Sequence, residues 1–152
     1  MWKSDGMAKM VDISGKGSVK RVATAEGSLR LKKSTLAAIS TNQVKKGDVI
    51  TVSKLAGIQA AKGTSALLPL CHQIPLTAVE LEIAIKRDRL VCKCTVSAEY
   101  KTGVEVEALV GVTTALLNAW DMVKYLEKDT RGQYPGTEIF GVKVTSKTKE
   151  DD

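Results

Sequence analysis

The chain has 152 residues, of which 43% are hydrophobic and 26% charged, and this length and composition indicate one folded domain and exclude a disordered or fibrous chain. Its 23 Lys and Arg residues outnumber its 17 Asp and Glu residues, so the formal net charge is +6, which suits a phosphorylated partner such as a nucleotide or a nucleic acid. Aromatic residues make up only 4%, which argues against binding by base stacking.

The N-terminal half is predicted to contain a strand followed by two helices. Residues 1–16 mix Gly, Ser, Lys and Asp without a sustained period, so we expect a flexible N-terminal arm. Residues 19–31 have the pattern of a strand pair or of one bent strand, broken at Gly27. Helices are predicted over residues 34–41 and 48–62, the second with Asp48 as its N-cap.

The C-terminal half is predicted to contain a hairpin, a long helix and a last strand. Residues 76–86 and 89–100 alternate between polar and apolar, and their short join predicts an antiparallel hairpin. Residues 102–105 (Thr-Gly-Val-Glu) have the form of a capping box, which would start a helix that runs to about Lys128 and is ended by Gly132 and Pro135. Residues 138–147 alternate again. On one face they place Phe140, Val142 and Val144, and on the other Lys143, Thr145 and Lys147.

This order of elements, β-α-α-β-β-α-β, predicts an α+β, ferredoxin-like fold with an antiparallel sheet packed against helices. The folded domain would span residues 17–147, followed by a charged C-terminal tail of residues 148–152. The long helix is apolar over more than one stripe. We therefore expect it to bury surface against a second subunit as well as against its own sheet.

The chain is expected to be a soluble, cytoplasmic protein. It has no run of ~18 apolar residues that could span a membrane, and its N-terminus lacks the apolar core of a secretory signal. Its three cysteines cannot all be paired within one chain, which favours a reducing compartment. Cys92 and Cys94 are predicted to be small buried residues rather than zinc ligands, because the chain has a single histidine.

Several polar residues have two interpretations from pattern alone. Lys45 and Lys46 precede a predicted helix, where they are either solvated loop lysines or part of an anion site. His72 is either a hydrogen-bonded structural residue or a proton carrier. Asp121 and Lys124, three residues apart on one helix face, form either a surface ion pair or an acid–base pair.

Two glutamates open the same long helix. Glu105 is explained by the predicted capping box, and the helix dipole favours both Glu105 and Glu107. Glu107 and Asp121 are 14 residues apart, which places them within about 40° of one helix face but roughly 21 Å apart along its axis. If both serve one site, two copies of the helix must pair antiparallel about a two-fold axis.

Five blocks occur in order along the chain: residues 10–14 (Met-Val-Asp-Ile-Ser), 46–62, 68–72 (Leu-Pro-Leu-Cys-His), 102–109 (Thr-Gly-Val-Glu-Val-Glu-Ala-Leu) and 121–124 (Asp-Met-Val-Lys). Together they resemble the cyclic pyranopterin monophosphate synthases, the accessory protein C family of molybdenum cofactor biosynthesis. The resemblance runs from about Val11 to Lys147. Two positions depart from the family pattern, where Gln73 replaces a proline and Gly63 replaces a bulkier or basic residue. The last strand also lacks the glycine-rich continuation of some members.

The resemblance implies a lyase, with residues 17–147 as a single catalytic domain. It would convert 3′,8-cyclo-7,8-dihydro-GTP to cyclic pyranopterin monophosphate and release pyrophosphate, a step of molybdopterin synthesis. It also implies a homohexamer, a trimer of dimers with the site at the dimer interface. No cofactor or protein-bound metal is implied beyond Mg²⁺ accompanying the triphosphate, and neither a nucleic acid nor a membrane is an expected partner.

The resemblance also implies which residues form the site. Lys46 and Lys124 would carry protons, and Asp121 would tune Lys124. The substrate-binding residues would be Arg21, Lys62, Cys71, His72, Glu105, Glu107, Met122 and Lys147.

Two alternatives come from other classes of protein. A small basic ferredoxin-like RNA-binding module would fit the net charge, but the predicted strands show no exposed aromatic pair that could stack bases. A purely structural oligomeric partner would release no pyrophosphate and would tolerate substitution of Lys46.

Overall fold

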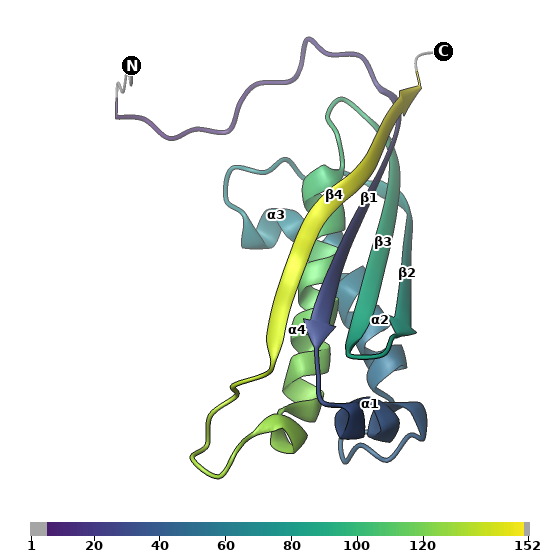
Figure 1. The fold of residues 1–152 in the computed structure, drawn as a ribbon. Helices are drawn as coiled ribbons and strands as arrows, with labels where there is room; N and C mark the ends of the chain where they lie inside the picture. The colour runs from purple at the N-terminus through teal and green to yellow at the C-terminus, as the bar shows by residue number, and fades with distance from the viewer. Residues whose placement is uncertain (1–5, 151–152) are drawn as a thin grey trace.

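The computed structural model describes residues 6–150, so residues 1–5 of the expected arm and residues 151–152 of the expected tail lie outside the described residues. A four-stranded antiparallel sheet has the order β2-β3-β1-β4, and α2 and α4 lie behind it in Figure 1. The α+β, ferredoxin-like prediction is therefore confirmed. The strands are β1 (Val19–Arg30), β2 (Leu76–Ile85), β3 (Arg89–Tyr100) and β4 (Glu138–Glu150), and the helices are α1 (Lys33–Ser40), α2 (Val49–Lys62), α3 (Thr64–Leu67) and α4 (Glu105–Glu127).

The core lies between the sheet and α4. The inward residues of β3 are at most 1% exposed, as the alternation of this strand predicts: Leu90, Cys92, Cys94, Val96 and Ala98. Helices α2 and α4 run in opposite directions, as two contacts show. Near the start of α2, Ser53 Oγ accepts a hydrogen bond from Asn118 Nδ2 in the second half of α4 (3.1 Å). Near the end of α2, Ala61 would lie 3.6 Å from a Cβ placed on Gly111 in the first half of α4. The end of α2 is thereby placed beside the start of α4.

The break expected at Gly27 is wrong, because β1 runs without interruption from Val19 to Arg30. Gly27 instead permits a close approach between the sheet and α4. A Cβ at this position would lie 2.8 Å from Val142 Cγ2 and 2.9 Å from Val112 Cγ1, closer than real Cβ contacts allow.

The irregularity lies in β4, which carries two register shifts against β1. Val144 pairs with Ala25 and Ser146 with Thr24, so Thr145 is an extra residue that has no partner in the register, as in a β-bulge. Strict alternation would place Lys147 on the same face as Thr145. The bulge turns Lys147 to the face covered by the helices instead, where it pairs with Ala23.

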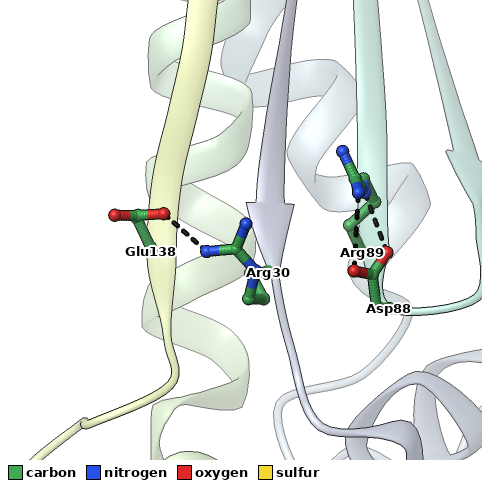
Figure 2. Close-up of polar contacts among 4 residues, drawn as sticks. All are labelled: Arg30, Asp88, Arg89 and Glu138. Atoms are coloured by element: carbon green, nitrogen blue, oxygen red, sulfur yellow. Dashed lines mark hydrogen bonds and ion pairs between the residues drawn. The ribbon is translucent and has the colours of Figure 1, made fainter.

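The open face of the sheet is stabilised at one end by two arginines (Figure 2). Arg30 and Arg89 are direct partners across β1 and β3, and each has its own carboxylate: Arg30 Nη1 lies 2.6 Å from Glu138 Oε1, and Arg89 Nε lies 2.8 Å from Asp88 Oδ1. Both guanidinium groups lie over the ring of Phe140, at 4.3 and 5.1 Å from its centroid. The second register shift in β4 lies opposite Gly27, between Glu26 and Ser28 of β1, and it turns Phe140 to the open face. Strict alternation would have placed this ring on the same face as Val142.

The capping box expected at the start of α4 does not form. Val104 occupies the N-cap position, and within the described residues it has no side-chain hydrogen bond that caps the helix. Glu105 turns toward β4 instead, where Lys147 Nζ lies 3.0 Å from its Oε1. The predicted N-cap of α2 is confirmed, since Asp48 Oδ1 accepts a hydrogen bond from Thr51 N at 3.1 Å.

The boundaries of the folded body also differ from the prediction at the C-terminus. Residues 148–150, expected in the charged tail, continue β4 because β1 is long enough to pair with them, Thr148 with Val22 and Glu150 with Lys20. At the other end, residues 6–18 form no helix or strand.

Within the described part of the chain, α4 is the one helix whose length and mean hydropathy of 1.2 would allow it to cross a membrane. Half of that apolar window is buried inside the fold. The helix packs on the sheet and against α2, so its apolar composition is that of a core helix.

Candidate active site

Most of the predicted site residues lie in two groups at opposite ends of α4. The lysine–aspartate cluster consists of Lys46, Asp121 and Lys124, and the glutamate pocket is lined by Cys71, His72, Glu105 and Glu107. Glu107 and Asp121 are 14 positions apart, which corresponds to roughly 21 Å of helix at ~1.5 Å per residue. A single chain therefore does not bring the two groups together.

In the lysine–aspartate cluster, one carboxylate contacts two ammonium groups. Lys46 Nζ lies 2.8 Å from Asp121 Oδ2, and Lys124 Nζ lies 3.4 Å from Asp121 Oδ1. The hydrogen bond and charge of Lys46, and then those of Lys124, hold the pKa of Asp121 below its ordinary value. The cluster therefore carries one positive charge in excess.

Local structure explains how Lys46 reaches α4. It lies in the turn before α2, where Gly47 adopts a φ of +112°, a conformation that favours glycine. The turn is attached to α4 by Tyr125, whose Oη accepts a hydrogen bond from Lys45 N at 2.9 Å. Tyr125 lies one helical turn beyond Asp121 on the same face, so the two residues hold adjacent parts of the loop.

In the glutamate pocket, one oxygen of a buried carboxylate lacks a hydrogen-bond partner among the described residues. Glu107 is 2% exposed, and its Oε1 has no hydrogen-bond partner among the residues that the structure describes. Its Oε2 accepts a weak hydrogen bond from Cys71 Sγ at 3.9 Å. Burial, with a smaller contribution from the charge of Glu105, raises the pKa of Glu107. Such an oxygen costs stability unless a ligand supplies a donor.

The pocket beside this carboxylate has a volume of about 340 Å³. Burial also raises the pKa of Cys71, so its thiol stays protonated and can donate to Glu107. The other residues that line the pocket include Leu70, His72, Thr102 and Glu105. The loop that carries Cys71 and His72 and the first turn of α4 together form its walls.

Two basic residues lie near the pocket on the sheet. Lys147 pairs with Glu105 at 3.0 Å. Arg21 donates to two backbone carbonyls at the end of β3, from Nε to Tyr100 O (3.2 Å) and from Nη2 to Lys101 O (3.3 Å). Arg21 therefore holds the loop that leads into α4, and its predicted contact with phosphate remains a prediction.

Lys62 lies at the end of α2, and it lines a different groove from the one that Glu107 lines. This groove has a volume of about 690 Å³, and β2 and the segment before it form its other wall, including Gln73, Pro75 and Val79. His72, on the same loop as Gln73, has its Nε2 2.6 Å from the carbonyl oxygen of Val11.

The side chain of Met122 lies in the core, apart from both groups, and its predicted contact with substrate stays a prediction. Met122 is 3% exposed, and Asn118 Nδ2 lies 3.3 Å from its sulfur in the core. The reason is helical geometry, because each residue is rotated by ~100° from the one before it. Asp121 faces solvent, and Met122 consequently faces the sheet.

Comparison with known proteins identifies the family. The model of the MoaC family matches residues 10–150. The chain belongs to the MoaC family. Curated relatives from Saccharolobus solfataricus and Archaeoglobus fulgidus, each named probable cyclic pyranopterin monophosphate synthase, are 54% and 50% identical to it over 145 residues. These alignments cover 95% of this chain and 97% and 93% of the two relatives. A relative of the same name from Thermococcus onnurineus is 50% identical over 143 residues, which cover 94% of this chain and 92% of the relative.

The MoaC match includes both groups of site residues as well as Val11 and Lys147. Two contacts in this MoaC chain escaped prediction. The contact of Val11 with His72 joins segments 61 residues apart, and its only sequence signal was the block of residues 10–14. The hydrogen bond between Lys45 N and Tyr125 Oη had no signal in the sequence, because a tyrosine on a helix face is common and does not by itself indicate a contact.

Among residues 6–150 of this MoaC chain, no three His, Cys, Asp or Glu side chains are grouped so that they could hold a metal ion. The glutamate pocket is lined by Cys71, His72, Glu105 and Glu107, and Lys147 pairs with the Glu105 carboxylate.

Proposed function

We propose that this MoaC family member is a lyase that converts 3′,8-cyclo-7,8-dihydro-GTP to cyclic pyranopterin monophosphate and pyrophosphate in molybdenum cofactor biosynthesis. The family and the printed names of relatives about half identical over nearly the whole chain support this reaction. The observation that carries it is the lysine–aspartate cluster, in which Asp121 contacts Lys46 at 2.8 Å and Lys124 at 3.4 Å.

The chemistry requires successive proton transfers while the purine ring opens and the pterin ring closes. Lys46 and Lys124 supply two amines for these transfers, and Asp121 stays ionised beside them to tune Lys124. Loss of pyrophosphate as the cyclic phosphate closes leaves negative charge on phosphate oxygens. Cations at the site, Lys46, Lys62, Lys124 and Arg21, would stabilise that charge.

The glutamate pocket would hold and orient the substrate. Glu107 Oε1 is an acceptor without a partner among the described residues, so an N–H or O–H of the substrate would satisfy it. His72 lines the same pocket and would contact the substrate as well. Any Mg²⁺ would be held mainly by the triphosphate, and we expect no other cofactor.

The active site would be shared between two subunits of a homohexamer, a trimer of dimers in the cytoplasm. The distance along α4 supports sharing, because a two-fold axis between antiparallel copies of α4 would bring Glu107 of one beside Asp121 of the other. The apolar surface of α4 supports it too, because Leu117 is 55% and Val106 36% exposed in the single chain.

The RNA-binding alternative receives no support. Phe140, the aromatic residue on the open face of the described sheet, lies under two arginines, each bound to its own carboxylate. A base therefore cannot stack on that ring without displacing them.

The test is pyrophosphate release by the purified protein supplied with the cyclised GTP intermediate. The matched pair of variants is Lys46→Ala and Lys128→Ala, since both remove one exposed lysine charge near the C-terminal half of α4. We expect release by wild type and Lys128→Ala and loss of about a hundredfold or more in Lys46→Ala. No release by the wild-type protein would overturn the proposal.

A further inference from the structure

The contact between Val11 and His72 assigns the proton on the imidazole ring. His72 Nε2 lies 2.6 Å from the carbonyl oxygen of Val11. A carbonyl oxygen can only accept a hydrogen bond, so Nε2 must donate one and must carry a proton. In the neutral ring the lone pair is then on Nδ1.

Val11 belongs to a segment without regular secondary structure. Residues 6–18 form neither helix nor strand, and all of them except Ile13 are exposed. The hydrophobic core begins further along the chain, at Ala23. The segment nevertheless forms a local turn next to Val11, in which Asp12 Oδ1 accepts a hydrogen bond from Ser14 N at 2.8 Å.

The acceptor that His72 meets is the backbone carbonyl of Val11, next to a carboxylate that is hydrogen-bonded within its own turn. The hydrogen bonds from Ser14 hold the pKa of Asp12 below its ordinary value, with smaller contributions from the charges of Lys101 and His72. The Asp12 carboxylate is thus engaged with Ser14, and the neutral carbonyl of Val11 is the group that bonds to the ring.

We propose that the Val11 carbonyl is a positioning group that holds His72 in its Nε2–H tautomer, so that Nδ1 is the ring nitrogen that accepts a hydrogen bond from the substrate. The N-terminal arm thereby orients His72, which lines the glutamate pocket beside Glu107. The contact with substrate rests on the proposed function, whereas the tautomer does not.

Because His72 is the single histidine, its tautomer can be read directly from long-range proton–nitrogen NMR correlations of the protein labelled at histidine. The spectra are recorded without substrate, at a pH at which the ring is neutral. The full chain is compared with a chain that lacks residues 2–12, which has lost Val11, and with a matched control that lacks residues 2–9, which keeps it. We expect a protonated Nε2 and an unprotonated Nδ1 in the full chain and in the control, and averaging between both tautomers in the longer deletion.

Turnover and thermal melting are measured on the same three proteins. Because neither deletion removes a described core residue, the melting temperature should move little. Turnover should fall about tenfold in the chain that lacks residues 2–12, roughly the contribution of one hydrogen bond, and should stay near wild type in the control.

A protonated Nδ1 in the full chain, or an unchanged tautomer after loss of residues 2–12, would overturn the proposal. A changed tautomer with unchanged turnover would also overturn it, because the orientation of His72 would then not be used. Since the tautomer is read without substrate, a full chain that fails to release pyrophosphate but keeps Nε2–H would overturn the proposed function and still support the assignment of the ring proton.

Discussion

Lys46 Nζ and Asp121 Oδ2 lie 2.8 Å apart, although 75 residues separate them along the chain. The contact joins the turn before α2 to the C-terminal half of α4. Because Lys124 reaches the same carboxylate from one helical turn away, three residues from two elements form one charged cluster. About half of each side chain is exposed (54%, 51% and 46%), so all three are accessible to a ligand.

Removing any member of this cluster should abolish most activity without unfolding the protein. Lys46→Ala, Lys124→Ala and Asp121→Asn are each expected to lower turnover about 10²-fold or more, the usual effect of losing an acid–base group. Their melting temperatures should stay close to wild type, because exposed ion pairs contribute little to stability. Pyrophosphate release and thermal melting measure the two effects. Near-normal turnover in all three variants would place the active site elsewhere.

Glu107→Gln should change how stability depends on pH. Burial raises the pKa of Glu107 above its ordinary 4.5, so the folded chain loses stability as pH rises from that value through the folded pKa. Glutamine does not ionise and lacks this loss. We therefore expect the melting temperature of Glu107→Gln, relative to wild type, to be higher at neutral pH than in acid.

The same variant separates stability from function. Its turnover should fall, because glutamine cannot offer the same acceptor to the substrate. A melting difference that is equal in acid and at neutral pH would contradict the raised pKa of Glu107. A variant with wild-type turnover would remove Glu107 from the substrate contacts.

Phosphate recognition should depend on charge. Pyrophosphate and GTP are expected to bind weakly, to compete with substrate and to lose affinity as salt rises. Lys62→Ala and Arg21→Ala should weaken this binding more than they slow turnover at saturation. Since Arg21 also holds the carbonyls of Tyr100 and Lys101, Arg21→Lys serves as the control that keeps the charge.

Calorimetric titration at several salt concentrations measures the effect. Affinity that is independent of salt would argue against the proposed cationic site. Tight binding of generic RNA by the same protein would instead favour the RNA-binding alternative.

The shared site predicts complementation between two inactive chains. A mixed dimer of Glu107→Gln and Asp121→Asn chains would contain one doubly damaged site and one intact site, so random pairing should restore about a quarter of wild-type turnover. The chains are unfolded together, refolded and assayed, and mass spectrometry of the intact complexes verifies the exchange. Exchanged mixtures that remain inactive would show that both groups act from one chain, or that one variant is inactive for a reason other than the loss of a catalytic group.

Glu127 should matter for stability and not for chemistry. This carboxylate is 1% exposed at the end of α4, and it accepts hydrogen bonds from Lys32 N (3.1 Å), Thr137 Oγ1 (2.7 Å) and Thr35 Oγ1. Glu127→Gln removes an acceptor from this set, so we expect a loss of about 1–3 kcal/mol in the free energy of unfolding. Denaturant titration measures it, and turnover well below the melting temperature should remain near wild type. Unchanged stability would mean that these bonds contribute nothing net.

Much of the fold was predictable because it depends on neighbours along the chain. The alternation in β2 and β3, the short join between them and the N-cap at Asp48 are local signals, and the structure confirms each. The lysine–aspartate cluster was partly local too. The spacing of three residues between Asp121 and Lys124 places them on one helix face, and their contact confirms it.

The errors occur where a residue's environment comes from distant segments. Gly27 looks like a strand breaker, but its role is set by Val112 and Val142, which pack over it. Glu105 completes a capping box by sequence, yet Lys147 on β4 competes for its carboxylate and forms the contact. Local propensity is a weak prior in such cases, because tertiary contacts outweigh a few tenths of a kcal/mol of preference.

By itself, then, the sequence determined the order of the elements, the inward faces of the hairpin, the family and the residue types available for chemistry. Only the tertiary structure decided which of those residues meet. One extra residue at Thr145 turns Lys147 to the side of Glu105, and an arm without regular structure brings Val11 to His72. Such contacts depend on bulges and long-range packing, whose free energies come from segments far apart in the chain, and periodicity in the sequence reports only on near neighbours.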